Sequence, residues 1–159
     1  MAEKHEELPT GSARKDSVLA ALDVVPDRWA FLVLREAFFG VRRFSDFRRS
    51  LGIARNTLSD RLNRLVESGV LEKRRIAESN AWQEYHLTEM GLDLYPVTVA
   101  LMRWGDRWVN SAGAPLLLFH QGCGGEVGLR VECSRCGVEV DARDVRYEPG
   151  PGGHGHDIP

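Results

Sequence analysis

Side chains that can hydrogen-bond to the edges of DNA bases are concentrated between Arg55 and Asn63. Arginine can pair with guanine through two hydrogen bonds, and asparagine can pair with adenine in the same way. The start of a helix is also where recognition helices contact bases. The predicted base-reading residues are Arg55, Asn56, Thr57, Ser59 and Asn63.

Four residues near the C-terminus have the spacing of metal ligands. Two residues separate His120 from Cys123, and two separate Cys133 from Cys136, with a glycine after each pair. Two such pairs suit a four-coordinate structural zinc site, because the glycine lets backbone amides turn toward the metal-bound sulfur. These four residues therefore predict a zinc-ribbon-like module with no open coordination position. The alternative is that the histidine is incidental and the cysteines are small buried thiols.

The predicted base-reading residues lie on the second of two short helices. Apolar residues repeat at helical spacing over 44–51 and again over 58–65. Gly52 interrupts the pattern and Gly69 ends it, as glycine does where the backbone must turn left-handed. Helix, glycine turn and helix form the outline of a helix-turn-helix, whose second helix lies in the DNA major groove. Ser45 is the predicted N-cap of the first helix.

The second helix has a polar face opposite its leucines. If the leucines point inward, Asn56, Asp60 and Asn63 point outward. An ordinary amphipathic helix with a solvated polar face is the alternative interpretation. Asp60 fits that alternative better, since phosphates repel a carboxylate that is not paired with an arginine or a cytosine amino group.

Basic residues are concentrated around this helix pair. Between Val41 and Arg75, ten lysines and arginines stand against four acidic residues, a net charge of +6 (10 − 4). The whole chain has a formal charge of −2, so the remainder carries −8 (−2 − 6). A basic block in an acidic chain is typical of contact with a polyanion, although basic runs are often merely solvated. The residues predicted to contact the DNA backbone are Arg42, Arg43, Ser45, Arg48, Arg49, Arg61, Lys73, Arg74 and Arg75.

Two strands are predicted after the helix pair, over 70–76 and 82–87, joined by a polar loop over 77–81. Lys73, Arg74 and Arg75 lie toward the tip of this hairpin, as in the basic wing of a winged helix. A plain surface hairpin with charged outer positions is the alternative.

The remaining helices are predicted to form the core and a dimer interface. A helix over 17–25 precedes a nearly apolar core helix over 29–39, which Asp27 is expected to cap. Thr88 is expected to cap a long helix that Pro96 kinks or restarts. The apolar stripe of this helix is too broad for one small domain to cover, which predicts a homodimer. The predicted interface residues are Leu92, Tyr95, Val99, Met102 and Trp108.

Length and composition predict one core with a small satellite module, because the chain has 159 residues and 43% hydrophobic content. The predicted fold is mainly α with a small β component (α+β). Its units are a flexible tail over 1–15, a winged helix-turn-helix over 16–112, the zinc-ribbon-like module over 113–148 and a flexible tail over 149–159. We expect a cytoplasmic protein without membrane contact. There is no apolar run of about 18 residues, the start lacks a signal-peptide pattern, and three cysteines do not suit a secreted disulfide framework.

Several segments resemble the HxlR family of bacterial winged-helix transcription regulators, which is related to the MarR group. They are ALDVVPDRW, LVLREAFFGVRRFSDFRRSLGIARNTLSDRLNRLVESGVLEKR, the YHLT run with Gly91, and ALMRWGDRW, in that order over about Asp16 to Val109. The resemblance implies a dimeric DNA-binding regulator without enzymatic activity, which dimerises through its terminal helices. It also implies that the Arg55–Asn63 face reads the major groove and that the Lys73–Arg75 hairpin is the wing.

The sequence departs from the family at one informative position. Several redox-sensing members carry a cysteine at the start of the first core helix, where this chain has Asp16. No cysteine precedes Cys123, so that redox route is chemically unavailable.

Two further hypotheses stay open. A winged helix could serve as a protein-interaction module that uses the C-terminal ribbon without specific DNA binding, although a dense arginine cluster favours DNA. A small-molecule effector is the second hypothesis. Trp29, Phe38 or Trp104 could line an apolar pocket for it, and a packed core explains the same residues equally well. No catalytic triad order, phosphate-binding glycine loop or open metal site is present in the sequence, so we do not expect an enzyme.

Overall fold

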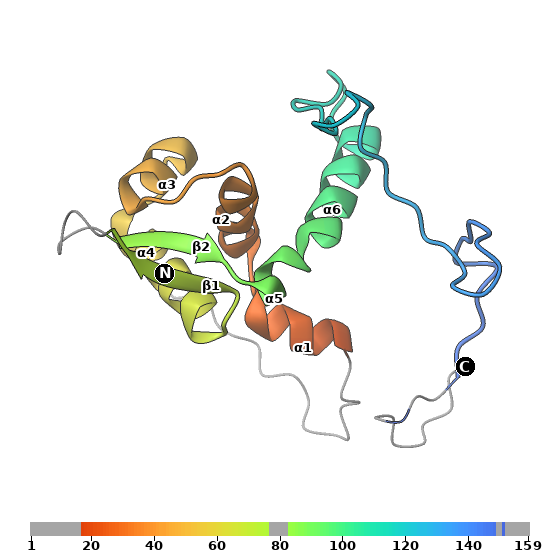
Figure 1. Ribbon diagram of the computed structural model, residues 1–159, viewed down its shortest axis with the longest axis horizontal. Coiled ribbons are helices and arrows are strands. Elements are labelled where there is room, and N and C mark those ends of the chain that lie inside the picture. The colour runs from red at the N-terminus through yellow and green to blue at the C-terminus, as the bar shows by residue number, and fades with distance from the viewer. Residues whose placement is uncertain (1–16, 77–82, 149–150, 152–159) are drawn as a thin grey trace.

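The computed structural model describes residues 17–76, 83–148 and 151, and shows helices with one two-stranded sheet (Figure 1). The predicted tail over 1–15, nearly all of the tail over 149–159 and the predicted loop over 77–81 lie outside the described residues. The elements are α1 (Ser17–Val24), α2 (Arg28–Phe38), α3 (Phe44–Leu51), α4 (Arg55–Glu67), β1 (Leu71–Arg75), β2 (Gln83–Leu87), α5 (Glu89–Leu92) and α6 (Tyr95–Trp108).

The helix-turn-helix forms as predicted, with α3 and α4 packed against α2. The side chains of Leu34, Phe47 and Leu58, one from each helix, are fully buried in one shared core. Gly52 follows α3 with φ at +60°, a conformation that glycine adopts without steric cost. The predicted N-cap at Ser45 is wrong. Arg43 occupies that position without a side-chain cap bond, so α3 begins two residues earlier and Ser45 lies in its first turn.

The wing is an antiparallel pair in which Leu71 lies opposite Leu87 and Lys73 opposite Tyr85. Leu71 and Tyr85 point into the core, and the ring of Tyr85 meets that of Phe47 edge-on at 6.3 Å between centroids. The outer residues of β1 stay exposed. The wing is therefore fixed at its base by apolar packing and carries its charges on the outer side.

A break between two helices follows the wing. Thr88 Oγ1 accepts a hydrogen bond from the Gly91 amide at 3.1 Å, which confirms the predicted cap. The helix stops at Leu92 and restarts at Tyr95 with Pro96 in its first turn, where the missing amide costs nothing. The predicted restart is therefore confirmed, and it turns α6 away from the wing (Figure 1).

The five predicted interface residues fall on different faces of this region. Val99 is only 2% exposed and Tyr95 packs edge-on against Phe38, with 5.1 Å between ring centroids. Val99 therefore belongs to the protomer's own core, and its assignment to a dimer interface is corrected. Tyr95 is only partly buried, so its place at an interface stays a prediction. Met102 is partly buried. Leu92 and Trp108 remain 48% and 65% exposed. The correction arises because residues four apart share a helix face, and this face is the one that packs on α2.

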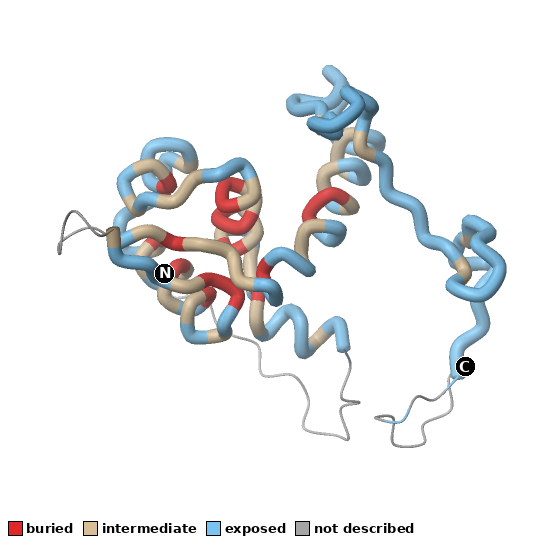
Figure 2. Tube along the Cα trace, viewed as in Figure 1, coloured by how far each residue is buried: buried red, intermediate tan, exposed pale blue. Residues whose placement is uncertain are grey.

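The segment over 113–148 contains turns and no regular strands. Its only β pairings within the described residues are single bridges, Phe119 with Glu126 and Glu132 with Glu139. None of the side chains over 113–148 is buried, as Figure 2 shows. Strands need a packed apolar face to hold them together, and the apolar side chains of this segment, such as Phe119, Val131 and Val138, are largely exposed. Among the described residues, no helix is long and apolar enough to cross a bilayer.

Candidate nucleic-acid interface

The predicted base-reading residues lie along the solvent side of α4. Arg55 and Asn56 are exposed in its first turn, and Thr57, Ser59 and Asn63 are partly exposed. The leucines of the opposite face are buried, as the helical spacing requires. The Arg55 guanidinium stands 5.9 Å from the Phe44 ring, a cation–π contact that steadies it without covering it.

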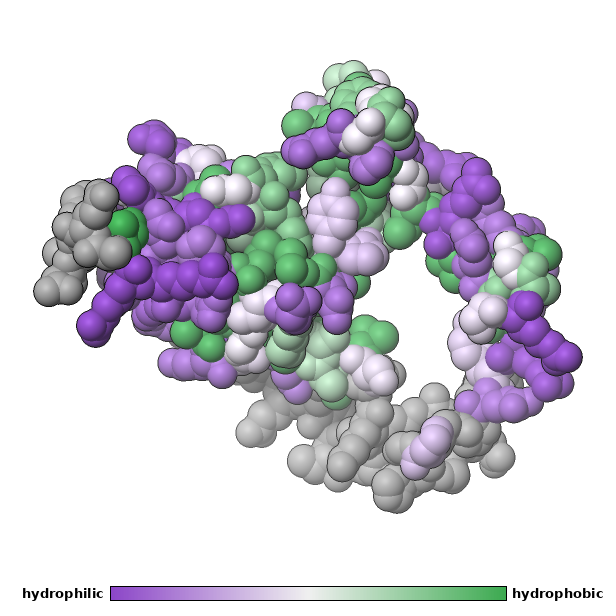
Figure 3. All heavy atoms as spheres, in the orientation of Figure 1, coloured by the Kyte–Doolittle hydropathy of each residue, from purple (hydrophilic) through white to green (hydrophobic). Residues whose placement is uncertain are grey.

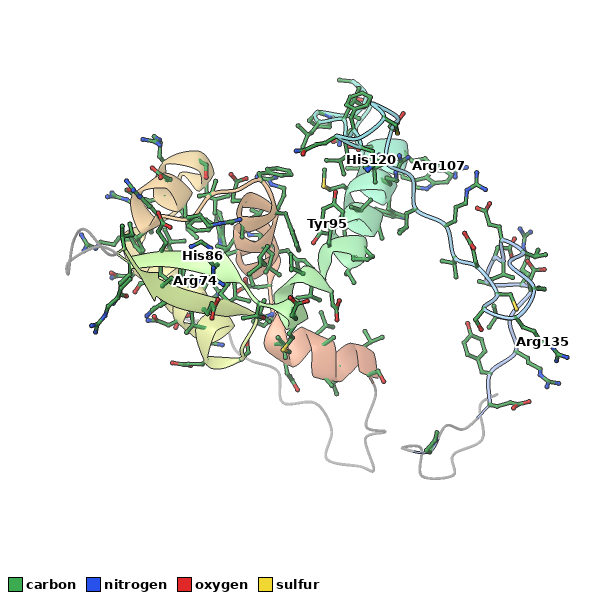
Figure 4. The ribbon with its side chains drawn as sticks, viewed as in Figure 1. Arg74, His86, Tyr95, Arg107, His120 and Arg135 are labelled. Carbon is green, nitrogen blue, oxygen red and sulfur yellow. The ribbon has the colours of Figure 1, made fainter. Side chains whose placement is uncertain are left out.

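A hydrogen bond joins α4 to the wing. Lys73 Nζ donates to Asn63 Oδ1 at 3.0 Å, and the same ammonium lies 5.8 Å from the Tyr85 ring. The polar face of α4 and the basic strand β1 therefore lie side by side. Figure 3 shows hydrophilic side chains over the wing and α3, and Figure 4 shows Arg74 and His86 on the two paired strands.

Most of the predicted backbone-contacting residues are exposed and weakly held. Arg49 pairs with Asp46 at 2.8 Å and Arg74 with Glu72 at 2.5 Å, while Arg43 pairs with Glu84 at 3.4 Å. Exposed pairs of this kind contribute only about 0–1 kcal/mol, so a phosphate can replace the acidic partner. Ser45, Arg48, Lys73 and Arg75 are also exposed.

Two of the residues predicted to contact the DNA backbone, Arg42 and Arg61, form hydrogen bonds within the protein. Arg42 Nη1 donates to the carbonyl oxygens of Ala37 at 2.6 Å and Val41 at 3.1 Å, at the carbonyl end of α2, where a cation is favourable. Arg61 Nε donates to Asp27 Oδ2 at 2.6 Å, because Arg61 lies on the flank of α4 that faces α2. Both arginines therefore help to hold α2 in place, and their contact with the DNA backbone stays a prediction.

The carboxylate of Asp60 is paired with two arginine side chains. Arg64 Nε lies 3.2 Å from Asp60 Oδ2, and Arg61 also donates to this carboxylate. Neutralisation by arginine is the condition under which an acid is tolerated beside phosphates. Asp60 therefore does not oppose a nucleic-acid contact at α4.

Asp27 links the helix-turn-helix to α2 through two kinds of contact. Its Oδ1 accepts from the Ala30 amide at 2.9 Å as the predicted N-cap, and its Oδ2 accepts from Arg61. Partial burial by itself raises the pKa of Asp27. The hydrogen bonds from Arg61 and Ala30 and the charge of Arg61 outweigh that effect and hold the pKa below its ordinary value of 3.8.

Replacement of Asp27 should therefore give a pH-dependent loss of stability. The amide introduced by Asp27→Asn can still cap the helix, so this variant should lose only the ion pair, whereas Asp27→Ala should lose about 1 kcal/mol more. The depressed folded pKa means that the carboxylate stabilises the fold above pH 3.8 and that this contribution disappears as the pH falls through the folded value. Urea unfolding at several pH values checks this. A gap between the unchanged protein and Asp27→Asn that stays constant into acid would contradict it.

The four predicted zinc ligands are placed as two separate pairs. His120 Nδ1 and Cys123 Sγ are 3.2 Å apart in one turn, and Cys133 lies beside Cys136 in another. Hydrogen bonds from the backbone amides of Arg135 and Cys136 lower the pKa of the Cys133 thiol. Among the described residues, no three or more histidine, cysteine or acidic side chains are gathered around one point. Figure 4 shows His120 and Arg135 in the two separate turns.

The hypothesis of an effector pocket lined by Trp29, Phe38 and Trp104 finds no support in their positions. Trp29 and Phe38 pack against the core, while Trp104 is 61% exposed on α6. The packed-core alternative explains Trp29 and Phe38, but it does not explain the exposed side chain of Trp104.

Helix α6 carries an exposed apolar stripe. It consists of Val97, Leu101, Trp104 and Trp108. Trp108 was predicted at an interface, whereas Val97 and Leu101 were not. The steps of four, three and four residues put all four on one face of a helix. That spacing is visible in the sequence, but a second apolar set on the α2-facing side obscures it.

Residues 24–112 match the HxlR-like helix-turn-helix family, which is more than half of the chain. The chain belongs to this family. It is 48% identical over 138 residues to the uncharacterized HTH-type transcriptional regulator Rv3095 of Mycobacterium tuberculosis, covering 86% of this chain and 87% of that protein. Because only 112 residues precede Gly113, the likeness to Rv3095 extends into the C-terminal segment.

Solved structures agree with the family assignment. The crystal structure of PA1607, described as a candidate transcription factor, matches at a TM-score of 0.77 with 38% identity, covering 84% of this chain and 94% of that one. A MarR-family regulator from Enterococcus faecalis V583 matches at 0.52 with 28% identity, covering 62% and 94%. This HxlR-family chain is therefore a transcriptional regulator of the helix-turn-helix type with a winged, MarR-like fold, and not an enzyme.

Proposed function

We propose that this HxlR-family regulator binds a specific, two-fold symmetric DNA site as a homodimer. In this proposal α4 lies in the major groove and the β1–β2 wing contacts the flanking groove. The hydrogen bond between Lys73 and Asn63 is the observation that carries the proposal. It supports a single DNA-facing surface, in which base-reading side chains of α4 lie beside phosphate-binding cations of the wing.

Charges on two elements that contact α4 support the same orientation. Arg48 and Arg49 belong to α3, and Lys73, Arg74 and Arg75 belong to β1. Phosphate contacts from both elements would fix the register of the helix, while α4 reads the bases. This arrangement of cations around a polar helix is complementary to DNA, which presents phosphates beside the base edges.

The homodimer is supported by an exposed apolar surface on α6. This surface is the stripe of Val97, Leu101, Trp104 and Trp108. Exposed apolar patches of this kind mark interaction surfaces, and a second copy with two-fold symmetry is the commonest partner. A dimer would also place two α4 helices on one palindromic site.

Substitutions at the start of α4 should relax sequence choice. We expect Arg55→Ala and Asn56→Ala each to weaken binding to the preferred site by about 1–3 kcal/mol and to leave binding to unrelated duplex nearly unchanged. Both side chains are exposed, so the fold should tolerate their loss. Competition titrations against single-base variants of the site measure this directly. Equal weakening on every duplex would remove α4 from the base-reading role.

Substitutions of the exposed cations should act differently. We expect Arg48→Ala and Lys73→Ala to weaken binding to all DNA to a similar extent and to reduce the slope of log K against log salt by about 1 each. Arg107→Ala is the matched control, because Arg107 is an exposed arginine on α6, away from α4 and the wing. A salt slope that changes in the control but not in Arg48→Ala would contradict the proposed surface.

A further inference from the structure

The C-terminal segment contains a structural repeat that DNA binding does not explain. We call residues 118–127 hairpin A and residues 131–140 hairpin B. Each of three backbone hydrogen bonds in hairpin A has a counterpart 13 residues later (133 − 120) in hairpin B. The pairs are Val127 N to Leu118 O with Val140 N to Val131 O, His120 N to Gly125 O with Cys133 N to Val138 O, and Gly124 N to His120 O with Gly137 N to Cys133 O. Their lengths agree within 0.1 Å, at 2.8–2.9 Å.

The repeat places chemically similar side chains at equivalent positions. His120 corresponds to Cys133 and Cys123 to Cys136, so each turn carries a potential metal ligand at its first and fourth positions. Gly124 and Gly137 follow the second ligand, each with φ at +70°, so the two turns share one backbone conformation. Only glycine adopts that conformation without strain, and it directs the backbone amides toward the ligand sulfur.

Within each turn the two ligand atoms are already close. The 3.2 Å between His120 Nδ1 and Cys123 Sγ is less than the separation of two ligands on one tetrahedral metal, which is about 3.5 Å for bonds of about 2.0–2.3 Å. Small adjustments would therefore let each hairpin hold one edge of a tetrahedron. Two such edges give four ligands: three thiolates and one imidazole.

Apolar packing does little to fix hairpins A and B relative to each other. Their apolar side chains, including Phe119, Val131 and Val138, are largely exposed. Only residues 128–130 separate the two hairpins, so the chain from 127 to 131 can span at most about 14 Å. Hairpin B therefore stays within reach of hairpin A, while the described residues provide no apolar core that joins them.

We propose that His120, Cys123, Cys133 and Cys136 bind one zinc ion, and that this ion draws hairpin B onto hairpin A. Binding converts three thiols to thiolates and releases three protons, with no change in oxidation state. The four ligands fill a tetrahedral site, so the metal is structural and does not activate water. Because the free segment has so few buried apolar groups, binding energy becomes folding energy for this module.

The metal also connects hairpin B to the proposed dimer helix. Hairpin A is attached to α6 through Arg103, whose Nη2 lies 3.0 Å from Glu126 Oε1 and also donates to the Val127 carbonyl. A zinc ion shared by both hairpins therefore orders the whole segment against α6. The DNA-binding helices 17–67 do not depend on it, since their core is closed without this segment.

Metal analysis of the full chain, purified without a histidine tag, tests the proposal. We expect about one zinc per chain by mass spectrometry, and after exchange for cobalt the absorption of a tetrahedral, thiolate-ligated ion. Cys133→Ser should lose the metal, and so should Cys123→Ser. Arg135→Ala, between the ligands of hairpin B, is the matched control and should keep it. His120→Cys should keep the metal where His120→Ala binds it much more weakly.

Three results would overturn the proposal. The first is a reduced, folded protein that takes up neither zinc nor tetrahedral cobalt. The second is metal binding that survives in Cys133→Ser and Cys123→Ser. The third is a Cys133–Cys136 disulfide that persists in the protein purified under reducing conditions. None of these measurements involves DNA, so the zinc site and the DNA-binding proposal succeed or fail independently.

Discussion

A Trp104→Asp variant will be monomeric and will bind the regulator's DNA site at least about 100-fold more weakly than the unchanged protein. Trp104 lies at the centre of the exposed α6 stripe, between Leu101 and Trp108, and does not belong to the protomer core. An aspartate there would place a charge in the apolar interface of the proposed dimer. Without the dimer, each α4 must find its half-site alone. Sedimentation equilibrium measures the mass, and anisotropy titration measures the affinity.

A residue just beyond the same helix provides the control for this variant. Asn110 is also exposed, and its side chain donates a hydrogen bond to Asp106 Oδ1 at 3.0 Å rather than contacting the stripe. Asn110→Asp introduces the same side chain and should leave the protein dimeric. If Trp104→Asp stays dimeric, or if both variants dissociate, the stripe is not the interface.

A Gly91→Ala variant will lose about 2–3 kcal/mol of folding free energy. A Cβ at Gly91 would overlap the carbonyl oxygen of Val70 and come within 3.0 Å of Leu87 Cδ2. Val70 is fully buried and its carbonyl also accepts a hydrogen bond from the Thr88 amide, so the backbone cannot move away freely. The close approach of α5 to the backbone just before β1 explains why a glycine stands there. Urea denaturation of both proteins measures the difference.

Gly105 offers the contrasting case on α6. A Cβ at Gly105 would meet nothing within 4 Å, and its φ is not left-handed. Gly105→Ala should therefore stabilise the protein by about 0.5–1 kcal/mol, because alanine restricts the unfolded chain and favours the helix. Equal effects of the two substitutions, in either direction, would show that the contact at Val70 is not the cause.

Local signals in the sequence predict most of the helix-turn-helix. The spacing of Phe44, Phe47 and Leu51 and the break at Gly52 locate α3 and its end, and Asp27 and Thr88 are correctly predicted as caps. These features depend on neighbours within one or two turns of chain. Pro96 likewise acts on its own helix, and a restart near Pro96 was one of the two outcomes that its position predicted.

Tertiary contacts account for what the sequence could not predict. Arg42 and Arg61 are arginines in a basic block, like their neighbours, and only the position of α2 shows that they are engaged within the protein. Val99 and Trp104 both belong to an apolar helix, and only packing on α2 separates the core face from the exposed one. At the C-terminus the ligand spacing is visible in the sequence. In our proposal, hairpins A and B come together only when one metal ion binds to ligands of both.

The measurement that tests the central claim most directly is a DNA titration by fluorescence anisotropy at several salt concentrations. It compares the region upstream of the regulator's own gene with a random duplex of equal length. We predict a steep salt dependence together with a preference of about 1,000-fold or more for the upstream fragment. Binding without preference would contradict base reading by α4. No binding even at low salt would contradict the DNA-facing surface altogether and would favour a winged helix that contacts another protein.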